Sequence, residues 1–222
     1  MKCYCNRTEE ALILCADNVE SELKKNLVAA WYHETNTGYQ KVYSMMDKEN
    51  GVSDKDVEIV SNNFSRLGPF MFQGDLDWNK ALLIIAEKFL ENNIEWYVFG
   101  SVSDALRGVK IIPHDLDIIV HTRDFFKVKS IFSDYVVEPF IDNKENWVVR
   151  YFGRISMDNS YIDVVAAESL DLENHLYDKI LWNGYDIFIE LFENRYNLEL
   201  KRNRPERLQA MDEYRQKYLQ TK

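Results

Sequence analysis

The feature that most constrains the fold is a change of pattern near residue 95, where helical periodicity gives way to short apolar segments. One such segment, at 95–99, ends at a Gly-Ser pair, and two others lie at 115–120 and 161–166. Short apolar runs bounded by turn residues predict β-strands, and a helical pattern over about 124–135 separates two of them. We therefore expect an α/β (α+β) fold in which helices flank a mixed β-sheet. Further strands are expected at 136–141 and 147–155.

The segments on either side of this core are predicted to be helical. Apolar residues recur at steps of three and four over 12–30, with Thr8 as a candidate N-cap. Ser53 and Asp77 precede two further periodic segments. Helical periodicity resumes at about Ser169, and Pro205 suits the first turn of a last helix. The expected division is a helical N-terminal region (1–76), a mixed core (77–168) and a C-terminal helical region (169–222).

The charge balance narrows the classes of function. The 27 basic and 37 acidic residues give a formal net charge of −10, and an acidic surface repels nucleic-acid backbones. The apolar stretches are too short to span a bilayer, and the first residues lead into acidic ones rather than into a signal-peptide core. We expect a cytoplasmic protein that neither coats nucleic acid nor binds membranes.

The cysteines do not form a recognisable framework. All three lie within the first fifteen residues, and this odd number without a later cluster favours reduced thiols over disulfides. The four histidines have no spacing typical of zinc ligands, so a zinc site is not expected. These histidines are His33, His114, His121 and His175.

Two aspartates at alternate positions are candidate metal ligands. In a β-strand alternate side chains share a face, so Asp115 and Asp117 project together while Leu116 enters the apolar side. Adjacent carboxylates raise each other's pKa unless a cation neutralises them, and a divalent ion that prefers oxygen ligands does so. The pair therefore predicts a Mg²⁺ site, with a solvated turn as the alternative.

A third aspartate and the Gly-Ser pair complete the pattern. Asp163 interrupts an apolar strand segment, where a carboxylate is costly to bury without a metal or a hydrogen-bond network. Gly100 permits close backbone approach, and Ser101 adds a hydroxyl donor at the start of a helix, where amide groups bind phosphate oxygens. Together these residues predict a site that holds a metal–triphosphate for in-line attack at phosphorus.

This pattern resembles the signature of the nucleotidyltransferase superfamily related to DNA polymerase β, over roughly residues 80–168. The run from Leu106 to Asp117 is similar to small bacterial antibiotic-modifying and minimal adenylyltransferases. The resemblance implies a nucleotidyltransferase-type sheet. It implies two Mg²⁺ ions that are bound by Asp115, Asp117 and Asp163. It also implies an NTP, with ATP favoured, whose phosphates contact Gly100 and Ser101. The family transfers a nucleoside monophosphate to a hydroxyl and releases pyrophosphate.

Several roles stay open in the sequence. Arg107 is a candidate phosphate ligand and Lys110 a weaker one, since both follow the Gly-Ser turn on a helix, although exposed cations there commonly face solvent. Asp163 and Glu168 are alternative general bases, and His114 is treated as structural. A basic cluster near the end favours a solvated helix face over phosphate binding. It comprises Arg195, Lys201, Arg202, Arg204 and Arg207.

Three functions compete on this evidence. The first is transfer of AMP from ATP to a small-molecule acceptor such as an aminoglycoside-like antibiotic, whose positive charge suits an acidic protein. The second is nucleotidylation of a macromolecule, either a partner protein or a tRNA, in a toxin–antitoxin-like system. The third is a nucleotide-binding module without turnover, which the presence of all three carboxylates disfavours.

Overall fold

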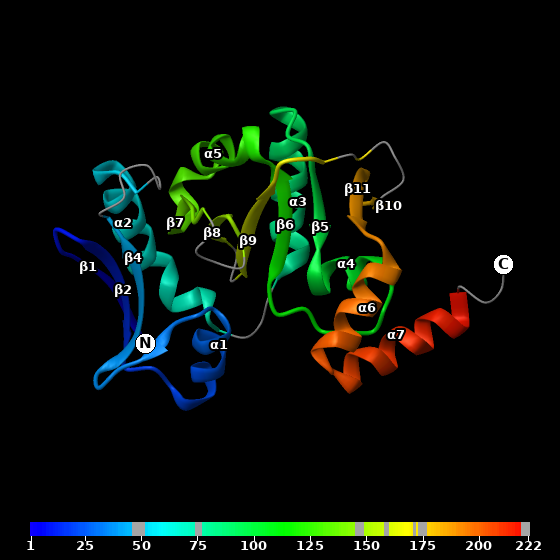
Figure 1. Ribbon diagram of the computed structural model, residues 1–222, viewed down its shortest axis with the longest axis horizontal. Coiled ribbons are helices and arrows are strands. Elements are labelled where there is room, and N and C mark those ends of the chain that lie inside the picture. The colour runs from blue at the N-terminus through cyan, green and yellow to red at the C-terminus, as the bar shows by residue number, and fades with distance from the viewer. Residues whose placement is uncertain are drawn as a thin grey trace.

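The computed structural model describes residues 1–45, 52–73, 77–144, 149–157, 160–170, 172 and 177–218. Within them the chain forms two β-sheets, and helix α2 (Asp54–Met71) packs against both, contacting β1 of the smaller sheet and β7 of the larger (Figure 1). The predicted mixed α/β architecture is confirmed. His175 and the first residues of the strand expected at 147–155 lie outside the described residues.

The larger sheet has seven strands in the order β10-β11-β5-β6-β9-β8-β7. β6 pairs in parallel with β9 and antiparallel with β5, whereas β8 pairs antiparallel with both β9 and β7. The strands predicted for the core are therefore present and adjacent. Their bounds are β5 (Trp96–Phe99), β6 (Leu116–His121), β7 (Val136–Asp142), β8 (Tyr151–Met157), β9 (Ser160–Ala167), β10 (Tyr177–Trp182) and β11 (Tyr185–Glu190).

Helices α2 and α3 begin at the capping residues expected from the sequence. Ser53 forms a capping box with Asp56 at the start of α2, and the Asp77 side chain accepts a hydrogen bond from the Lys80 amide at the start of α3 (Trp78–Glu91). The apolar stripe expected for α3 is buried from Ala81 to Phe89, with Leu82 and Phe89 fully inaccessible, whereas Leu90, expected in the same stripe, is 69% exposed. The remaining core helices are α4 (Gly100–Arg107) and α5 (Thr122–Ile131), which leads into the 3₁₀ turn η3 (Ser133–Tyr135).

The single helix predicted over 12–30 is wrong, although its last part, Lys24–Ala29, is α-helical. Instead an antiparallel sheet forms in the order β1-β2-β4-β3, and Thr8 accepts amide hydrogen bonds in the β1–β2 turn. β2 is apolar on both faces, so its alternation is hidden and steps of three and four can be drawn through it. The elements are β1 (Lys2–Arg7), β2 (Ala11–Asp17), η1 (Ser21–Leu23), α1 (Lys24–Ala29), β3 (His33–Glu34) and β4 (Gly38–Ser44).

The C-terminal region is also only partly helical. The hairpin of β10 and β11 adds two strands to the edge of the larger sheet, joined by Asn183 and Gly184 with φ of 48° and 85°. An Asn-Gly pair between two alternating segments is a strong hairpin signal, and this one was missed by the helical prediction. The helices α6 (Phe192–Arg202) and α7 (Pro205–Tyr218) follow, and Pro205 begins the last helix as predicted.

Both sheets share one hydrophobic core. It runs from Cys3, Leu12 and Leu14 in the smaller sheet, through α2 and α3, to Ile118 and Val164 in the larger sheet. The three cysteines are free thiols. No helix in the described part of the chain is long and apolar enough to cross a membrane.

The strand assignment of the N-terminal region gives a direct test. Leu14→Ala should lower the free energy of unfolding by about 2–5 kcal/mol, because Leu14 is fully buried in β2. Val42→Ala in the neighbouring strand should cost under about 1 kcal/mol, since Val42 is 61% exposed. Urea denaturation measures both, and equal losses would contradict the two-faced sheet.

Candidate active site

The register of the larger sheet brings the three predicted aspartates together. Asp117 on β6 and Asp163 on β9 are direct partners across the parallel pair, so their side chains share one face. Asp115 lies two residues before Asp117. One carboxylate oxygen from each of the three residues lies within 4.8 Å of the others. The acidic cluster predicted from the sequence is therefore present in the fold.

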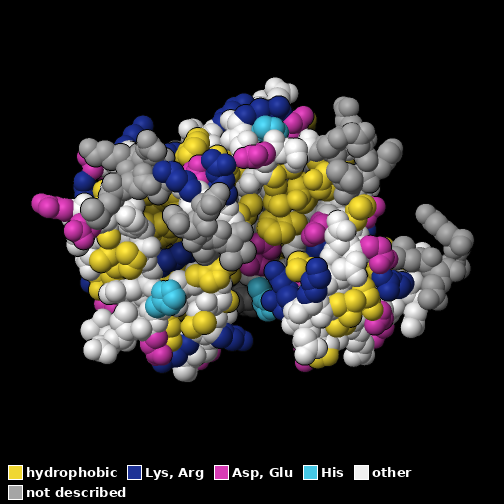
Figure 2. Space-filling model, viewed as in Figure 1, with side chains coloured by type: hydrophobic (Ala, Val, Ile, Leu, Met, Phe, Trp, Pro, Cys, Tyr) yellow, Lys and Arg dark blue, Asp and Glu magenta, His cyan; other side chains and the backbone are white. Residues whose placement is uncertain are grey.

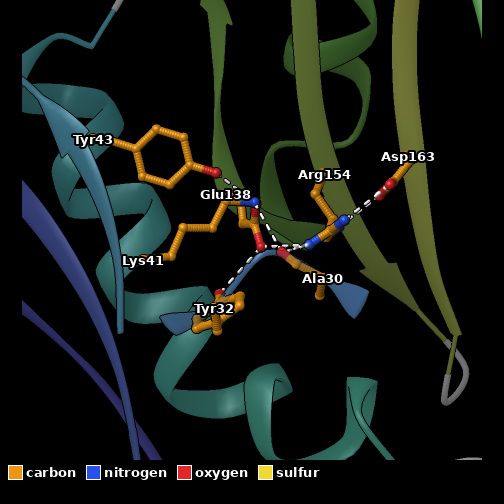
Figure 3. A network of polar contacts seen from close by, with 7 residues as sticks. All are labelled: Ala30, Tyr32, Lys41, Tyr43, Glu138, Arg154 and Asp163. Atoms are coloured by element: carbon orange, nitrogen blue, oxygen red, sulfur yellow. Dashed lines mark hydrogen bonds and ion pairs between the residues drawn. The ribbon is translucent and has the colours of Figure 1, made fainter. Parts of the chain in front are cut away.

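The same cross-strand row continues into buried charges that the sequence analysis missed. Arg154 on β8 is the register partner of Asp163, and Glu138 on β7 is the partner of Arg154. The Arg154 guanidinium donates from Nε to Asp163 Oδ1 (2.5 Å) and from Nη2 to Oδ2 (2.9 Å), as Figure 3 shows. Its Nη1 donates to Glu138 Oε1 at 2.7 Å. The available signal was a charged residue within each of two otherwise apolar strand segments.

The three aspartates differ in how their charge is compensated. Asp163 has Arg154 as its counter-ion. Burial, followed by repulsion from Asp163, raises the pKa of Asp115 to about 6. Burial, followed by repulsion from Asp115 and Asp163, raises the pKa of Asp117 well above its ordinary value. The protein thus leaves two carboxylates short of positive charge, and this oxygen-only donor set fits a divalent ion such as Mg²⁺.

The Gly-Ser turn lies directly against this cluster. Gly100 has φ of +70°, and a Cβ atom at this position would lie 2.1 Å from Asp117 Oδ2. A side chain is therefore excluded both by the backbone conformation and by the carboxylate. Ser101 is 3% exposed, yet its hydroxyl has no hydrogen-bond partner within the described residues. A buried donor of this kind beside the first amides of α4 fits a phosphate oxygen.

A cavity of about 890 Å³ opens over the acidic cluster. Its basic wall consists of Arg202 in α6, Arg204 between α6 and α7, and Arg207 in α7. Lys25, Trp31 and Phe72 line the cavity from the N-terminal region. In Figure 2 the molecule is hollowed between its N-terminal half and the C-terminal helices, with basic side chains along the C-terminal side.

The C-terminal basic cluster is more than a solvated helix face. Arg195 is fully buried and pairs with Asp104 and Glu199, each at 2.9 Å. Three further guanidinium groups lie 3.6–3.8 Å from Glu199, which leaves more positive than negative charge on this wall. They belong to Arg202, Arg204 and Arg207.

Other predicted residues lie elsewhere. Arg107 forms an ion pair with Asp178 and donates to the Glu190 carbonyl at 2.5 Å, outside the residues that line the cavity. Glu168 follows β9 at the end far from Asp163 and pairs with Arg150. The structure therefore does not bring Arg107 or Glu168 to the acidic cluster. His114, which was treated as structural, does line the cavity, whereas Lys110 does not.

The uncompensated carboxylates predict a pH-dependent stability in EDTA. Ionising Asp115 costs free energy in the folded state, because its folded pKa of about 6 lies above the ordinary value of 3.8. This cost is absent near pH 4 and complete above about pH 6. Asp115→Asn should therefore stabilise the metal-free protein by about 1–3 kcal/mol at pH 7.5, and the gain should vanish near pH 4. Urea denaturation at both pH values measures the difference.

Asp56→Asn is the control, and its effect on the free energy of unfolding should have the opposite sign. Burial alone would raise the pKa of Asp56, but hydrogen bonds from Lys129 and Ser53 lower it. Asp56→Asn should therefore destabilise the protein at pH 7.5, and this loss should shrink as the pH falls. Destabilisation of both variants at pH 7.5 would show that Asp115 has a counter-ion in the folded protein.

No protein-family model matches the chain, and no curated protein matches it. A candidate nucleotidyltransferase from Thermotoga maritima is similar in structure, with a TM-score of 0.51 and 22% identity over 64% of this chain and 94% of that one.

Two antibiotic-modifying enzymes are less similar. The lincosamide antibiotic adenylyltransferase LnuA, bound to lincomycin, has a TM-score of 0.44 and 15% identity over 60% of this chain and 95% of that one. ANT(2'')-Ia, in complex with adenylyl-2''-tobramycin, has a TM-score of 0.42 and 12% identity over 60% of this chain and 87% of that one. With the Thermotoga maritima structure as the basis, this chain has the nucleotidyltransferase fold.

Proposed function

We propose that the protein is a Mg²⁺-dependent nucleotidyltransferase that transfers a nucleoside monophosphate, AMP from ATP in the favoured case, to a hydroxyl group. The observation that carries this proposal is the pair Asp115 and Asp117, two uncompensated carboxylates at the base of a cavity with a basic wall. A site built this way holds cations next to a polyphosphate, which is the requirement of phosphoryl transfer.

Each residue of the cluster has a separate task in this proposal. Asp115 and Asp117 hold Mg²⁺, and Asp163 completes the ligand set at the edge nearest β8. When bound, the metal neutralises charge that develops on the transferred phosphoryl group. Two ions fit the proposal, since three carboxylates are available for them.

The triphosphate is bound from two sides. The Ser101 hydroxyl and the first amides of α4 donate to phosphate oxygens, and Gly100 lets the backbone approach Asp117 without a side chain between them. From the basic wall, Arg204 and Arg207 supply charge to the outer phosphates. These groups retain the pyrophosphate while the bond to the α-phosphorus breaks.

The proposed transfer is a single displacement at the α-phosphorus. The acceptor oxygen forms a bond to the α-phosphorus, the bond between that phosphorus and the bridging oxygen breaks, and pyrophosphate leaves with its electron pair. The acceptor's proton passes to a base or to water. Both oxygens of Asp163 accept hydrogen bonds from Arg154, and each keeps a lone pair for one further contact. We assign that contact to the metal, because Asp163 lies within 4.8 Å of the other two carboxylates.

A small molecule is the favoured acceptor. A cavity of about 890 Å³ is within the size range of sites that enclose small ligands. An aminoglycoside-like antibiotic remains the type of acceptor that the acidic composition favours. A macromolecular acceptor, a protein or a tRNA, is the second candidate, because the side chains of Arg202 and Arg204 at the cavity are 46% and 45% exposed.

Transfer should be directly measurable. The protein is incubated with Mg²⁺, each of four α-labelled NTPs and an acceptor panel of aminoglycosides, lincosamides, tRNA and proteins. Asp117→Asn should lower transfer by at least about a hundredfold, because the loss of one carboxylate removes a metal ligand. Label on tRNA or protein alone would select the second acceptor class. If no NTP binds and Asp117→Asn matches the unsubstituted protein, the proposal fails.

The basic wall gives a separate prediction. Arg207→Ala should raise the KM for ATP about tenfold, because Arg207 faces the cavity and its charge is partly desolvated. Arg107→Lys should leave that KM within about twofold, since Arg107 lies outside the cavity. Steady-state kinetics on folded variants compares the two. The reverse pattern would move the phosphate site to Arg107.

A further inference from the structure

Arg154 and Arg195 are the two arginines among the fully buried side chains of the described residues, and Arg154 lies beside the acidic cluster. Burying a guanidinium group is costly unless every part of it is paired. Its Nε and Nη2 bond to Asp163, and its Nη1 bonds to Glu138 and to the Ala30 carbonyl at 3.3 Å. The arginine is thus held on both sides, and it presents a flat two-donor edge to Asp163.

Glu138 is held in turn by residues of the smaller sheet. Lys41 Nζ and the Tyr43 hydroxyl, both from β4, donate to its Oε2 at 2.5 Å each, and the Tyr32 hydroxyl donates to its Oε1 at 3.1 Å (Figure 3). Burial alone would raise the pKa of Glu138, but Arg154 and Lys41 hold it at about 2. Glu138 is therefore a fixed anion between two cations.

These contacts form a continuous chain of alternating charge. It begins at Lys41 in the N-terminal sheet, passes through Glu138 and Arg154, and ends at Asp163. Lys41 Nζ also donates to the Ala30 carbonyl at 3.2 Å, the same oxygen that Arg154 contacts. The N-terminal region is thus connected to the acidic cluster by hydrogen bonds at every step.

The guanidinium fork constrains Asp163 more than a point charge would. Two parallel hydrogen bonds fix the rotation of the carboxylate plane as well as its position. Each oxygen keeps a further lone pair for a metal ion. The carboxylate is thereby oriented before a metal binds. In metal sites generally, hydrogen-bond partners behind the ligands orient the ligand side chains in the same way.

We propose that Arg154 is a positioning residue that orients Asp163 for metal binding, and that Lys41 and Glu138 extend this support into the N-terminal sheet. The proposal rests on the metal site of the proposed function. The smaller sheet then contributes to the metal site, because the orientation of Asp163 depends in part on Lys41 of β4.

A charge-conserving variant tests the first part. Arg154→Lys keeps the positive charge but loses the planar fork, so electrostatic attraction for the metal is unchanged while orientation is lost. Mn²⁺ binding, measured by electron paramagnetic resonance on the purified protein, should weaken about tenfold. Arg123→Lys, at an exposed Arg–Glu pair with Glu95, is the matched control and should leave Mn²⁺ affinity unchanged.

A double-mutant cycle shows whether Arg154 acts through Asp163. In the Asp163→Asn background, Arg154→Lys should change Mn²⁺ affinity by less than about twofold, because the oriented carboxylate is already gone. A merely structural role of Arg154 would give the same loss in both backgrounds, and that result overturns the proposal.

The second part is tested by removing a Lys–Glu pair without changing net charge. Lys41→Met/Glu138→Gln should weaken Mn²⁺ binding at least about fivefold. Lys24→Met/Glu34→Gln removes an exposed pair at 3.2 Å in the same region and should have no effect. If the double variant does not fold, Tyr43→Phe takes its place as the test. This variant deletes one hydrogen-bond donor to Glu138 and should also weaken Mn²⁺ binding.

The outcomes separate this inference from the proposed function. Coupled effects on Mn²⁺ binding without nucleotidyl transfer would support the positioning role and reject the activity. Transfer by the unsubstituted protein, with Mn²⁺ affinity unaltered by Arg154→Lys and by the Lys41/Glu138 variant, would support the activity and overturn the positioning role.

Discussion

The register between β6 and β9 is the constraint on which the site depends. Pairing Asp117 with Asp163 puts two carboxylates on one face of the sheet, and the neighbouring registers add Arg154 and Glu138 to the same row. A slip of one residue would turn every side chain of one strand to the opposite face. The acidic cluster, its counter-ion and the support behind it would all be lost in that single change.

Charge alternates along this row until it reaches Asp117. Lys41, Glu138, Arg154 and Asp163 each have a neighbour of opposite sign, but Asp117 is next to Asp163 and close to Asp115. The alternation ends where the cavity opens. Along this row a cation is therefore missing at Asp117, where the proposed metal–nucleotide would bring one, and this links the electrostatics of the sheet to the proposed chemistry.

The sequence predicted the parts of the site that depend on local pattern. Asp117 lies on β6 and Asp115 immediately before it, so both were found from alternate positions along one segment, and the Gly-Ser turn was found from a strand-to-helix junction. Arg154 could not be assigned, because its role depends on which strand lies beside β9. The two-faced apolar character of β2 concealed the N-terminal sheet. By contrast, Asn183-Gly184 is a sequence signal for the β10–β11 hairpin, and the helical prediction for this region did not use it.

The hydrophobic core common to both sheets has a consequence for how this chain can change. Deleting the smaller sheet would expose the apolar faces of α2 and leave Glu138 without Lys41, Tyr32 and Tyr43. Glu138 would keep Arg154 as its counter-ion but lose three buried hydrogen bonds, and this loss together with a bare apolar surface is enough to unfold a domain of marginal stability. A substitution at a residue where the two sheets meet therefore changes the packing of both sheets.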